Sequence, residues 1–414
     1  MKRKSKYSEN IISLIFFMLP IVDAINGFMV RTKGFYGVGS VYHLAFVIIL
    51  LLTAYRNGKV PFGFYERETV VLILASVGSI MVNSLFYETE SISIERIEKI
   101  ICTVLSITAL IRLIKNQIVS EKTIKKIVRM QCIMVPTITL AADLLGVANY
   151  TYQSAKVGRI GFYTGSNEPV AVLTMLGGIL FVELSENFNL QYLFLFLETL
   201  LCLILVQSKL GYLMAAILLL SSAFLMLRSL MRKGRVKTLH LVVGSLVVIV
   251  GIVVGRDMLA KTLDAFLQRQ AYQKKYLGES SFLDYISSGR TMRFKALLTP
   301  ILDGNPFYVL FKLLFGQGAR FGYSETFEMD YFDAFLYGGI FMMICLLWLT
   351  YKALKNAKKK SGVLLESIVL IFIYAFVGGH VWTGGVSGLY LALLLAYCAT
   401  INDYKMKKYG TQRI

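Results

Sequence analysis

The chain has 414 residues, of which 56 % are hydrophobic and only 17 % charged, and its mean hydropathy is +0.63. This composition excludes an ordinary soluble domain, in which about a quarter of the residues are Asp, Glu, Lys or Arg. The net charge of +19 would suit a nucleic-acid-binding protein. The basic residues, however, are distributed as in a membrane protein, and no nucleic-acid partner is expected.

Apolar runs long enough to cross a bilayer recur along most of the chain. A helix needs roughly 17–25 apolar residues to span the hydrocarbon layer. The sequence therefore predicts an all-α polytopic membrane protein with about 12 transmembrane helices. The expected spans are 11–30, 38–55, 68–87, 97–114, 129–148, 168–184, 189–206, 211–230, 238–255, 333–351, 363–380 and 385–401. The very short connection at 207–210 predicts a tight helical hairpin.

The Lys and Arg residues indicate how these spans are oriented. With a cytoplasmic N-terminus, most of them fall in inner segments, among them 112–129, 228–237, 352–360 and 405–413. Short cytoplasmic loops carry this excess in multi-pass membrane proteins. Both termini are therefore expected inside. The first apolar run continues through Pro20 into a span with no small-residue cleavage site, which favours an anchor over a cleaved signal peptide.

The five cysteines all fall within expected spans. They are interpreted as small apolar packing residues, and their spacing predicts neither a disulfide framework nor a metal site. No glycine-rich phosphate loop and no room for a nucleotide-binding domain are evident. We expect no cofactor and no metal.

One connection is much longer than the others. Nine spans in residues 1–255 precede an extracytoplasmic loop at 256–332, and three spans and a cytoplasmic tail follow at 333–414. The loop has apolar residues at helical spacing in 258–272 and 291–302, and a short apolar piece at 306–315. A long polar insertion on one face predicts a surface where something is bound or made.

Several outer cations could hold an anion. Arg159, Arg290 and Arg320 lie in outer loops, and Lys209 lies at the tip of the tight hairpin. Guanidinium groups bind phosphate through two parallel hydrogen bonds, so arginines converging from separate segments would form an anion clamp. The alternative is that each is a solvated side chain near lipid headgroups.

Acids cluster where the tenth span begins, at Glu328, Asp330 and Asp333. Asp330 suits the N-cap of that helix, and acids there favour the helix dipole. Glu328 precedes the cap and is a candidate general base for a sugar hydroxyl. His380, at the outer end of the eleventh span, is either a second base or a polar anchor.

Three other polar residues carry a weaker signal. His43, Asp23 and Asp143 lie toward the outer ends of their spans. Ionisable residues inside a membrane are functional candidates by default, so the two acids are kept as such.

Five segments in order resemble the O-antigen ligase and Wzy-type polysaccharide polymerase superfamily. They are 158–167 (GRIGFYTGSN), 208–211 (SKLG), 288–290 (SGR), 314–318 (LFGQG) and 328–340 (EMDYFDAFLYGGI). Two departures are visible: Lys209 stands where that family's hairpin tip has Arg, and Glu328 stands where ligases carry His. An acid at the second position looks more like the capsule and exopolysaccharide polymerases.

The resemblance implies a metal-independent, inverting glycosyltransferase with a GT-C-like fold. Its donor would be an oligosaccharide on undecaprenyl pyrophosphate at the outer face of the bacterial cytoplasmic membrane. Arg159, Arg290, Arg320, Lys209 and Asp330 would bind the pyrophosphate and glycan, and Glu328 or His380 would be the base. A flippase and a chain-length regulator would be partners, besides membrane lipids.

Two alternatives remain at this stage. A polysaccharide ligase would transfer the glycan to a different acceptor. A lipid-linked glycan transporter would be expected to have charges deep in several spans and matching broken helices, and no need of a long outer loop.

Overall fold

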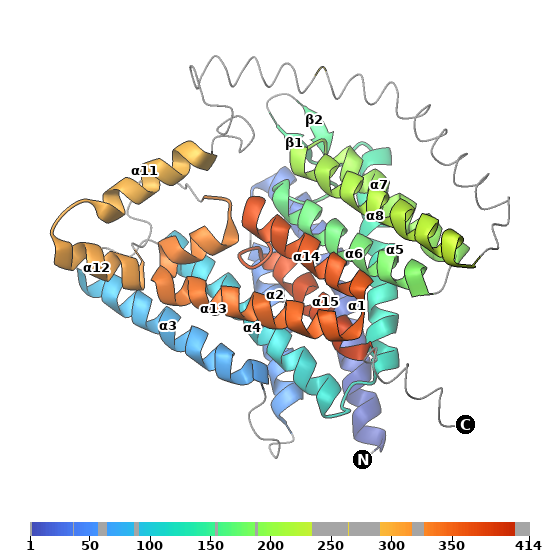
Figure 1. Ribbon diagram of the computed structural model, residues 1–414, viewed down its shortest axis with the longest axis horizontal. Coiled ribbons are helices and arrows are strands. Elements are labelled where there is room, and N and C mark those ends of the chain that lie inside the picture. The colour runs from blue at the N-terminus through green and yellow to red at the C-terminus, as the bar shows by residue number, and fades with distance from the viewer. Residues whose placement is uncertain are drawn as a thin grey trace.

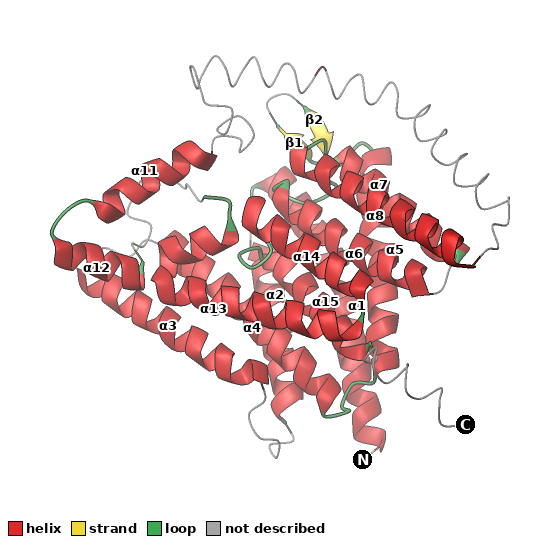
Figure 2. Ribbon diagram, viewed as in Figure 1, coloured by secondary structure: helices red, strands yellow, loops and turns green. Residues whose placement is uncertain are grey.

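The computed structural model describes residues 2–35, 37–56, 64–86, 91–153, 156–186, 189–233, 264, 290–316 and 327–401. In these residues thirteen helices form one bundle, and a two-stranded antiparallel hairpin lies at one end of it (Figures 1 and 2). The helices up to the hairpin are α1 (Lys2–Lys33), α2 (Gly37–Tyr55), α3 (Phe64–Phe86), α4 (Ser91–Lys115) and α5 (Glu121–Leu144). The hairpin is β1 (Tyr150–Tyr152) and β2 (Val157–Arg159), followed by α6 (Asn167–Glu186), α7 (Leu190–Leu205) and α8 (Lys209–Lys233). The remaining helices are α11 (Arg290–Leu302), α12 (Pro306–Phe315), α13 (Asp330–Lys360), α14 (Gly362–Val377) and α15 (Gly385–Thr400).

The chain is a helical, multi-pass membrane protein by the length and composition of its helices. Six of the described helices are long and apolar enough to cross a bilayer, namely α1, α2, α3, α5, α6 and α13. Helices lie at eleven of the twelve positions expected for spans, and the twelfth, 238–255, falls outside the described residues. The tight hairpin is confirmed as α7 and α8, and the short loop helices as α11 and α12. The piece expected at 258–272 lies outside the described residues.

The core of the bundle is built around α6 and α15. Almost every residue of α15 is buried, and it packs against α4, α5 and α6 (Figure 1). Helices α3 and α12 lie at one edge of the bundle, where α12 contacts α3 and α13. Side chains such as Leu74, Leu85 and Phe307 are exposed there, as expected for a lipid-facing edge.

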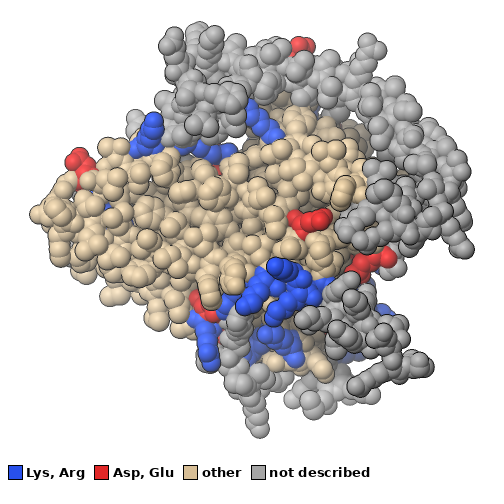
Figure 3. Space-filling model, in the orientation of Figure 1, with Lys and Arg blue, Asp and Glu red and all other residues tan. Residues whose placement is uncertain are grey.

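The two ends of the bundle differ. We call the end where α1 begins the proximal end and the opposite end, which carries the hairpin and α11, the distal end (Figure 1). The backbone N–H of Ser120 donates to Glu9 Oε1, which fixes the start of α5 at the proximal end as well. On the face shown in Figure 3, Lys and Arg side chains lie mainly along these two ends, with largely uncharged surface between them. That pattern is typical of a protein whose middle lies in hydrocarbon.

Local sequence sets several helix starts. Ser120 caps α5 by accepting from the N–H of Thr123, and Asn305 caps α12 by accepting from Phe307, with Pro306 in the first turn. The cap expected at Asp330 is wrong by one residue, because Met329 occupies that position of α13. Asp333 instead binds the segment before the helix, since its carboxylate accepts from the N–H groups of Phe327 and Met329.

Helix α13 is broken near its distal end. Gly339 has φ +71°, a left-handed conformation that a residue with a Cβ rarely adopts. A Cβ at Gly339 would come within 2.1 Å of the Leu314 carbonyl oxygen, so the end of α12 packs directly on the break. Ser79 of α3 donates to the Tyr337 carbonyl, at 3.0 Å, which is one of the acceptors near the break. The break therefore ties α3, α12 and α13 together just below the distal end.

Candidate functional site

Arg290 and Glu328 are the centre of a polar site at the distal end. Arg290 begins α11, and its Nη2 donates to Glu328 Oε2 at 2.9 Å. Arg293, one turn later, places Nη1 3.5 Å from Glu328 Oε1. The side chain of Arg290 is 10 % exposed and that of Glu328 is 35 % exposed, so the carboxylate is the more accessible member of the pair. Arg290 Nε is buried and has no hydrogen-bond partner in the described chain, which leaves one guanidinium donor for an anion.

The backbone around Glu328 is strained. Glu328 and His380 both have positive φ, +57° and +62°. A Cβ placed on Gly379 would lie 2.6 Å from the Glu328 carbonyl group, so the 378–384 loop packs directly on the backbone of Glu328. Non-glycine residues with positive φ cost about 1–3 kcal/mol each and persist only where surrounding contacts impose them. The geometry thus brings the two residues predicted as alternative bases to the same place.

Asp330 holds the 378–384 loop in position. The carboxylate is fully buried and accepts from the N–H groups of Val381, Trp382 and Thr383 at 2.7, 3.0 and 3.3 Å. It also accepts from Thr383 Oγ1 at 2.6 Å. Asp330 was predicted to bind substrate, but both of its oxygens are used by the protein. It fixes the backbone that follows His380.

The 378–384 loop also faces charged residues of α4 and α6. The positive charges of Arg96 and Lys99 act on His380. A Cβ on Gly384 would meet Glu168 Oε1 at 2.8 Å, so the start of α6 touches the other end of the loop. Lys99 is itself paired with Glu95, at 2.5 Å, one turn earlier in α4. The loop is therefore surrounded by several cations and three carboxylates, Glu168, Glu328 and Asp330.

At neutral pH, Glu328 is a carboxylate and His380 a neutral imidazole. Burial alone would raise the pKa of Glu328, but Arg290 and Arg293 outweigh it and lower that pKa below its usual range. Burial and the nearby Arg96 guanidinium lower the pKa of His380 to about 4. A carboxylate paired with two arginines is a weak base. It becomes a stronger one when another anion takes its place on the guanidinium groups.

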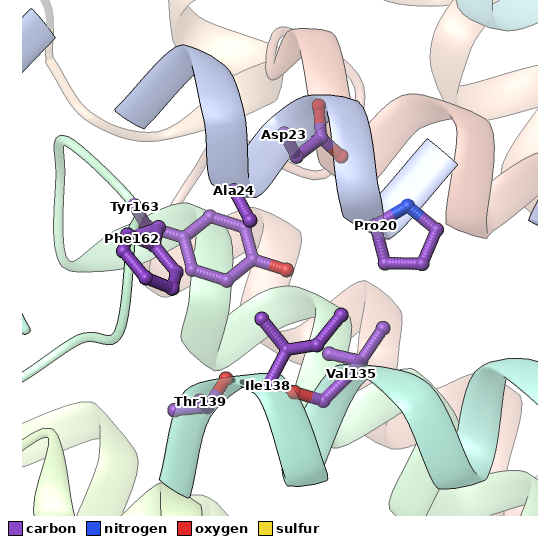
Figure 4. Close-up of a pocket in the computed structure, with 8 residues that line it drawn as sticks. All are labelled: Pro20, Asp23, Ala24, Val135, Ile138, Thr139, Phe162 and Tyr163. Atoms are coloured by element: carbon purple, nitrogen blue, oxygen red, sulfur yellow. Dashed lines mark hydrogen bonds between the residues drawn. The ribbon is translucent and has the colours of Figure 1, made fainter. Parts of the chain in front are cut away.

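The weaker candidates Asp23 and His43 form a buried pair. His43 Nε2 lies 2.8 Å from Asp23 Oδ1, while Asp23 Oδ2 has no partner in the described residues. A small cavity beside Asp23 is lined by residues of α1, α5 and the segment before α6 (Figure 4). The ring of Tyr163 lies between Asp23 of α1 and Thr139 of α5 (Figure 4). A Cβ on Gly385 would lie 3.4 Å from His43 Nδ1, which places this pair next to the start of α15.

Arg159 lies in a second basic corner of the distal end. It ends β2, with Nε 3.2 Å from Asp143 Oδ1 and its guanidinium 4.2 Å from the centre of the Tyr150 ring. The hairpin is fastened to the α7–α8 turn, where Gln207 Oε1 accepts from the N–H of Gly158 at 2.8 Å. Lys209 follows that turn as the first residue of α8. The hairpin and α11 lie apart at the distal end (Figure 1).

The two corners meet at the 378–384 loop. A Cβ on Gly378 would come within 2.7 Å of Leu210 Cδ1, so the residue after Lys209 contacts one end of the loop. Gly379 contacts Glu328 in the same way. Arg159 and Arg290, predicted to share one clamp, have no direct contact in the described chain. The loop is the structural element that connects them.

Some predicted residues lie outside the described part, and others were missed. Arg320 falls in 317–326, outside the described residues. Arg293, Arg96, Lys99 and Glu168 were not singled out from the sequence. Arg293 carried a usable signal, because it lies three residues after Arg290 in an expected helix. No signal pointed to the other three, which reach the loop from distant helices.

The described residues contain no group of three or more His, Cys, Asp or Glu side chains able to hold a metal ion. The five cysteines are free, three of them buried, as their interpretation as packing residues requires. No protein-family model matches the chain, and comparison with curated proteins and with solved structures gave no match either.

Proposed function

We propose that this protein is a glycosyltransferase that joins oligosaccharide units carried on undecaprenyl pyrophosphate into a polymer. The reaction would take place at the outer face of the bacterial cytoplasmic membrane, with the distal end outward. The observation that carries the proposal is Arg290: its guanidinium is nearly buried, pairs with a partly exposed carboxylate, and has one donor without a partner in the described part of the chain. The motif resemblance supplies the substrate class.

The arrangement suits departure of a pyrophosphate. The acceptor hydroxyl oxygen attacks the anomeric carbon of the donor sugar as the bond from that carbon to the pyrophosphate oxygen breaks. The electron pair of that bond goes to the leaving group, whose growing charge Arg290 and Arg293 stabilise. Attack from the opposite side inverts the anomeric centre. Two preorganised guanidinium groups supply the positive charge without a divalent metal.

Glu328 would have two successive roles. In the free protein it is the counter-ion of Arg290 and Arg293. The pyrophosphate displaces it from these groups, its basicity rises, and it takes the proton of the acceptor hydroxyl. This exchange would couple donor binding to activation of the base. His380, a neutral imidazole beside Glu328, is the alternative acceptor of the proton.

The second basic corner would act farther from the bond that breaks. Lys209 precedes Leu210, which contacts Gly378 of the 378–384 loop, and together with Arg159 it would contact the glycan or its lipid phosphate. Arg320, in the loop before Glu328, is proposed to complete the clamp. A flippase and a chain-length regulator remain the expected protein partners.

The test is transfer by purified protein in liposomes, with lipid-linked oligosaccharide extracted from the same bacterium. Glu328→Gln should lower the rate of polymer formation by roughly 10²–10⁴-fold while binding donor at least as tightly as the wild type. Glu98→Gln, an exposed acid of α4, is the control and should be active. Near-normal polymer from Glu328→Gln would overturn Glu328 as base and favour His380.

The products separate the alternatives. A ladder of repeat units supports a polymerase, whereas transfer of one intact glycan to a foreign acceptor would indicate a ligase. Movement of unchanged donor across the membrane, without a new glycosidic bond, would contradict the proposal and indicate a transporter.

A further inference from the structure

A basic groove opens at the proximal end, far from the site described above. Its cavity volume is about 570 Å³, and it lies between the first turns of α5, the last turns of α6 and the start of α7. Lys122, Lys125, Lys126 and Arg129 line it from α5. All four lie within the first nine residues of that helix, and all four are exposed.

The lysines of this groove are not paired with an acid among the described residues. No carboxylate of the described chain lies within 4.0 Å of Lys122, Lys125 or Lys126, although Glu121 and Glu183 line the same groove. Elsewhere at the proximal end, by contrast, Arg112 is paired with Glu66, and Lys352 with Glu68. The groove therefore keeps a concentrated positive charge, whereas the charges of Arg112 and Lys352 are compensated by acids.

Arg129 is held at the inner end of the groove. Its Nη2 donates to the Tyr192 hydroxyl, and its guanidinium lies 5.1 Å from the centre of that ring. Tyr192 belongs to α7, so this contact joins α5 and α7 at the groove. A guanidinium ordered in this way loses little conformational entropy when it binds an anion.

Below the cations the groove is apolar. Val128, Cys132, Ile179 and Leu180 form this part of the lining. Next to it, Ile133 and Phe194 are 38 % and 64 % exposed on the outer surfaces of α5 and α7. A ligand that fits both parts has an anionic head and apolar chains that run on toward the surrounding lipid.

We propose that this groove is a binding site for the headgroup of an anionic phospholipid of the proximal leaflet. Its phosphate takes hydrogen bonds from Arg129 and charge from the three lysines, and its acyl chains lie along the apolar lining and Ile133. A soluble phosphate would use the cations but leave the apolar lining unfilled. A neutral zwitterionic lipid would fill the lining but leave the cations uncompensated. The proposal is independent of the glycosyltransferase reaction.

The experiment measures lipid binding to the full-length protein in detergent by native mass spectrometry, titrating phosphatidylglycerol and, separately, phosphatidylcholine. The variant is Lys122→Gln, Lys125→Gln and Lys126→Gln together. Its control is Lys115→Gln, Lys358→Gln and Lys359→Gln, which removes three exposed lysines from the same end. Thermal unfolding of each variant checks that it is folded. A basic residue near an anionic surface contributes about fivefold in affinity. The groove variant loses three of them, so it should bind phosphatidylglycerol roughly a hundredfold more weakly.

Three outcomes decide the proposal. Loss of phosphatidylglycerol binding in the groove variant, with retention in the control variant, supports it. Equal losses in the two variants would mean a diffuse attraction to basic surface and would overturn it. If inorganic phosphate or glycerol phosphate competes at the concentration at which the lipid binds, the acyl chains contribute nothing and a lipid site is also overturned.

Discussion

Two buried arginines at opposite ends of the molecule are held in different ways. At the proximal end, Arg112 and Glu66 are 8 % and 5 % exposed, and Arg112 Nε also donates to the Ala54 carbonyl at 3.3 Å. Tyr55 donates to Glu66 Oε1, and its ring lies 4.3 Å from the Arg112 guanidinium. At the distal end, Arg290 Nε has no partner among the described residues, and the partner carboxylate Glu328 is 35 % exposed. The proximal pair is enclosed by the protein, whereas the distal pair has a partly exposed carboxylate and a guanidinium nitrogen without a partner among the described residues.

The largest expected effect follows from breaking the Arg112–Glu66 pair. Glu66→Gln leaves the Arg112 guanidinium buried without a counter-charge, which should cost about 3–5 kcal/mol of folding free energy. Thermal unfolding of the purified protein in detergent measures it. The control is Glu95→Gln, whose pair with Lys99 is exposed and should cost less than about 1 kcal/mol. Equal stability of the two variants would mean that the Arg112–Glu66 pair is not structural.

The second prediction concerns the Arg290–Glu328 pair. Arg290→Ala should reduce glycan transfer by about 10²–10³-fold and leave the unfolding temperature close to that of the wild type. Arg290→Lys should recover little activity, because an ammonium group lacks the planar fork that binds phosphate. Full activity of the lysine variant would show that only a point charge is needed. A large loss of stability in Arg290→Ala would place this residue with Arg112 as a structural cation.

The third prediction uses pH. Because the pKa of His380 is lowered to about 4, the imidazole is neutral at pH 5 and above, and it gains its proton only as the pH falls through about 4. The rate of transfer should therefore show no step near pH 6.5. Arg96→Gln removes one of the cations that oppose protonation of His380, so the pKa of His380 should rise. The loss of transfer rate at low pH should then begin at a higher pH than in the wild type. If the pH dependence of the transfer rate is unchanged in Arg96→Gln, His380 does not take part in the reaction.

The smallest expected effect concerns Arg159. Its pair with Asp143 is about a third exposed, so Arg159→Ala should cost no more than about 1 kcal/mol of stability. Transfer should fall less than tenfold, and the loss should multiply with that of Arg290→Ala if the two corners act separately. Parallel rate measurements on the single and double variants test this. A double variant no worse than Arg290→Ala alone would show that both arginines hold the same pyrophosphate.

Hydropathy was sufficient to predict the helices and insufficient to predict which side chains meet. Runs of apolar residues had to be buried in lipid or protein, and the positions of α7, α8, α11 and α12 followed from them. The hairpin β1–β2 was not predicted, because two strands of three residues leave no periodicity to detect. The contact between Arg290 and Glu328 depends on how α11 packs near α13, and residue types alone do not specify this packing.

The acids at the start of α13 also show that residue types alone do not reveal which side chains meet. Asp330 and Glu328 were both placed in the substrate site from their position at the outer face. Only the fold distinguishes the two acids. Asp330 accepts hydrogen bonds from the backbone of 381–383, whereas Glu328 forms ion pairs with two arginines. Two carboxylates only two residues apart in sequence therefore have different surroundings, because different parts of the chain bind them.

The break at Gly339 decides which way the distal end of α13 faces. Phe341, Ile344, Trp348 and Tyr351 are each about half exposed, and they follow one another at three- and four-residue intervals. Continued toward the distal end, the same series would run through Tyr337, Ala334 and Asp330. An unbroken helix would therefore present the Asp330 carboxylate on the stripe that faces hydrocarbon. These three residues are instead buried. The left-handed turn at Gly339 resets the helical phase, and with it an aspartate that would have faced lipid becomes the anchor of the His380 loop.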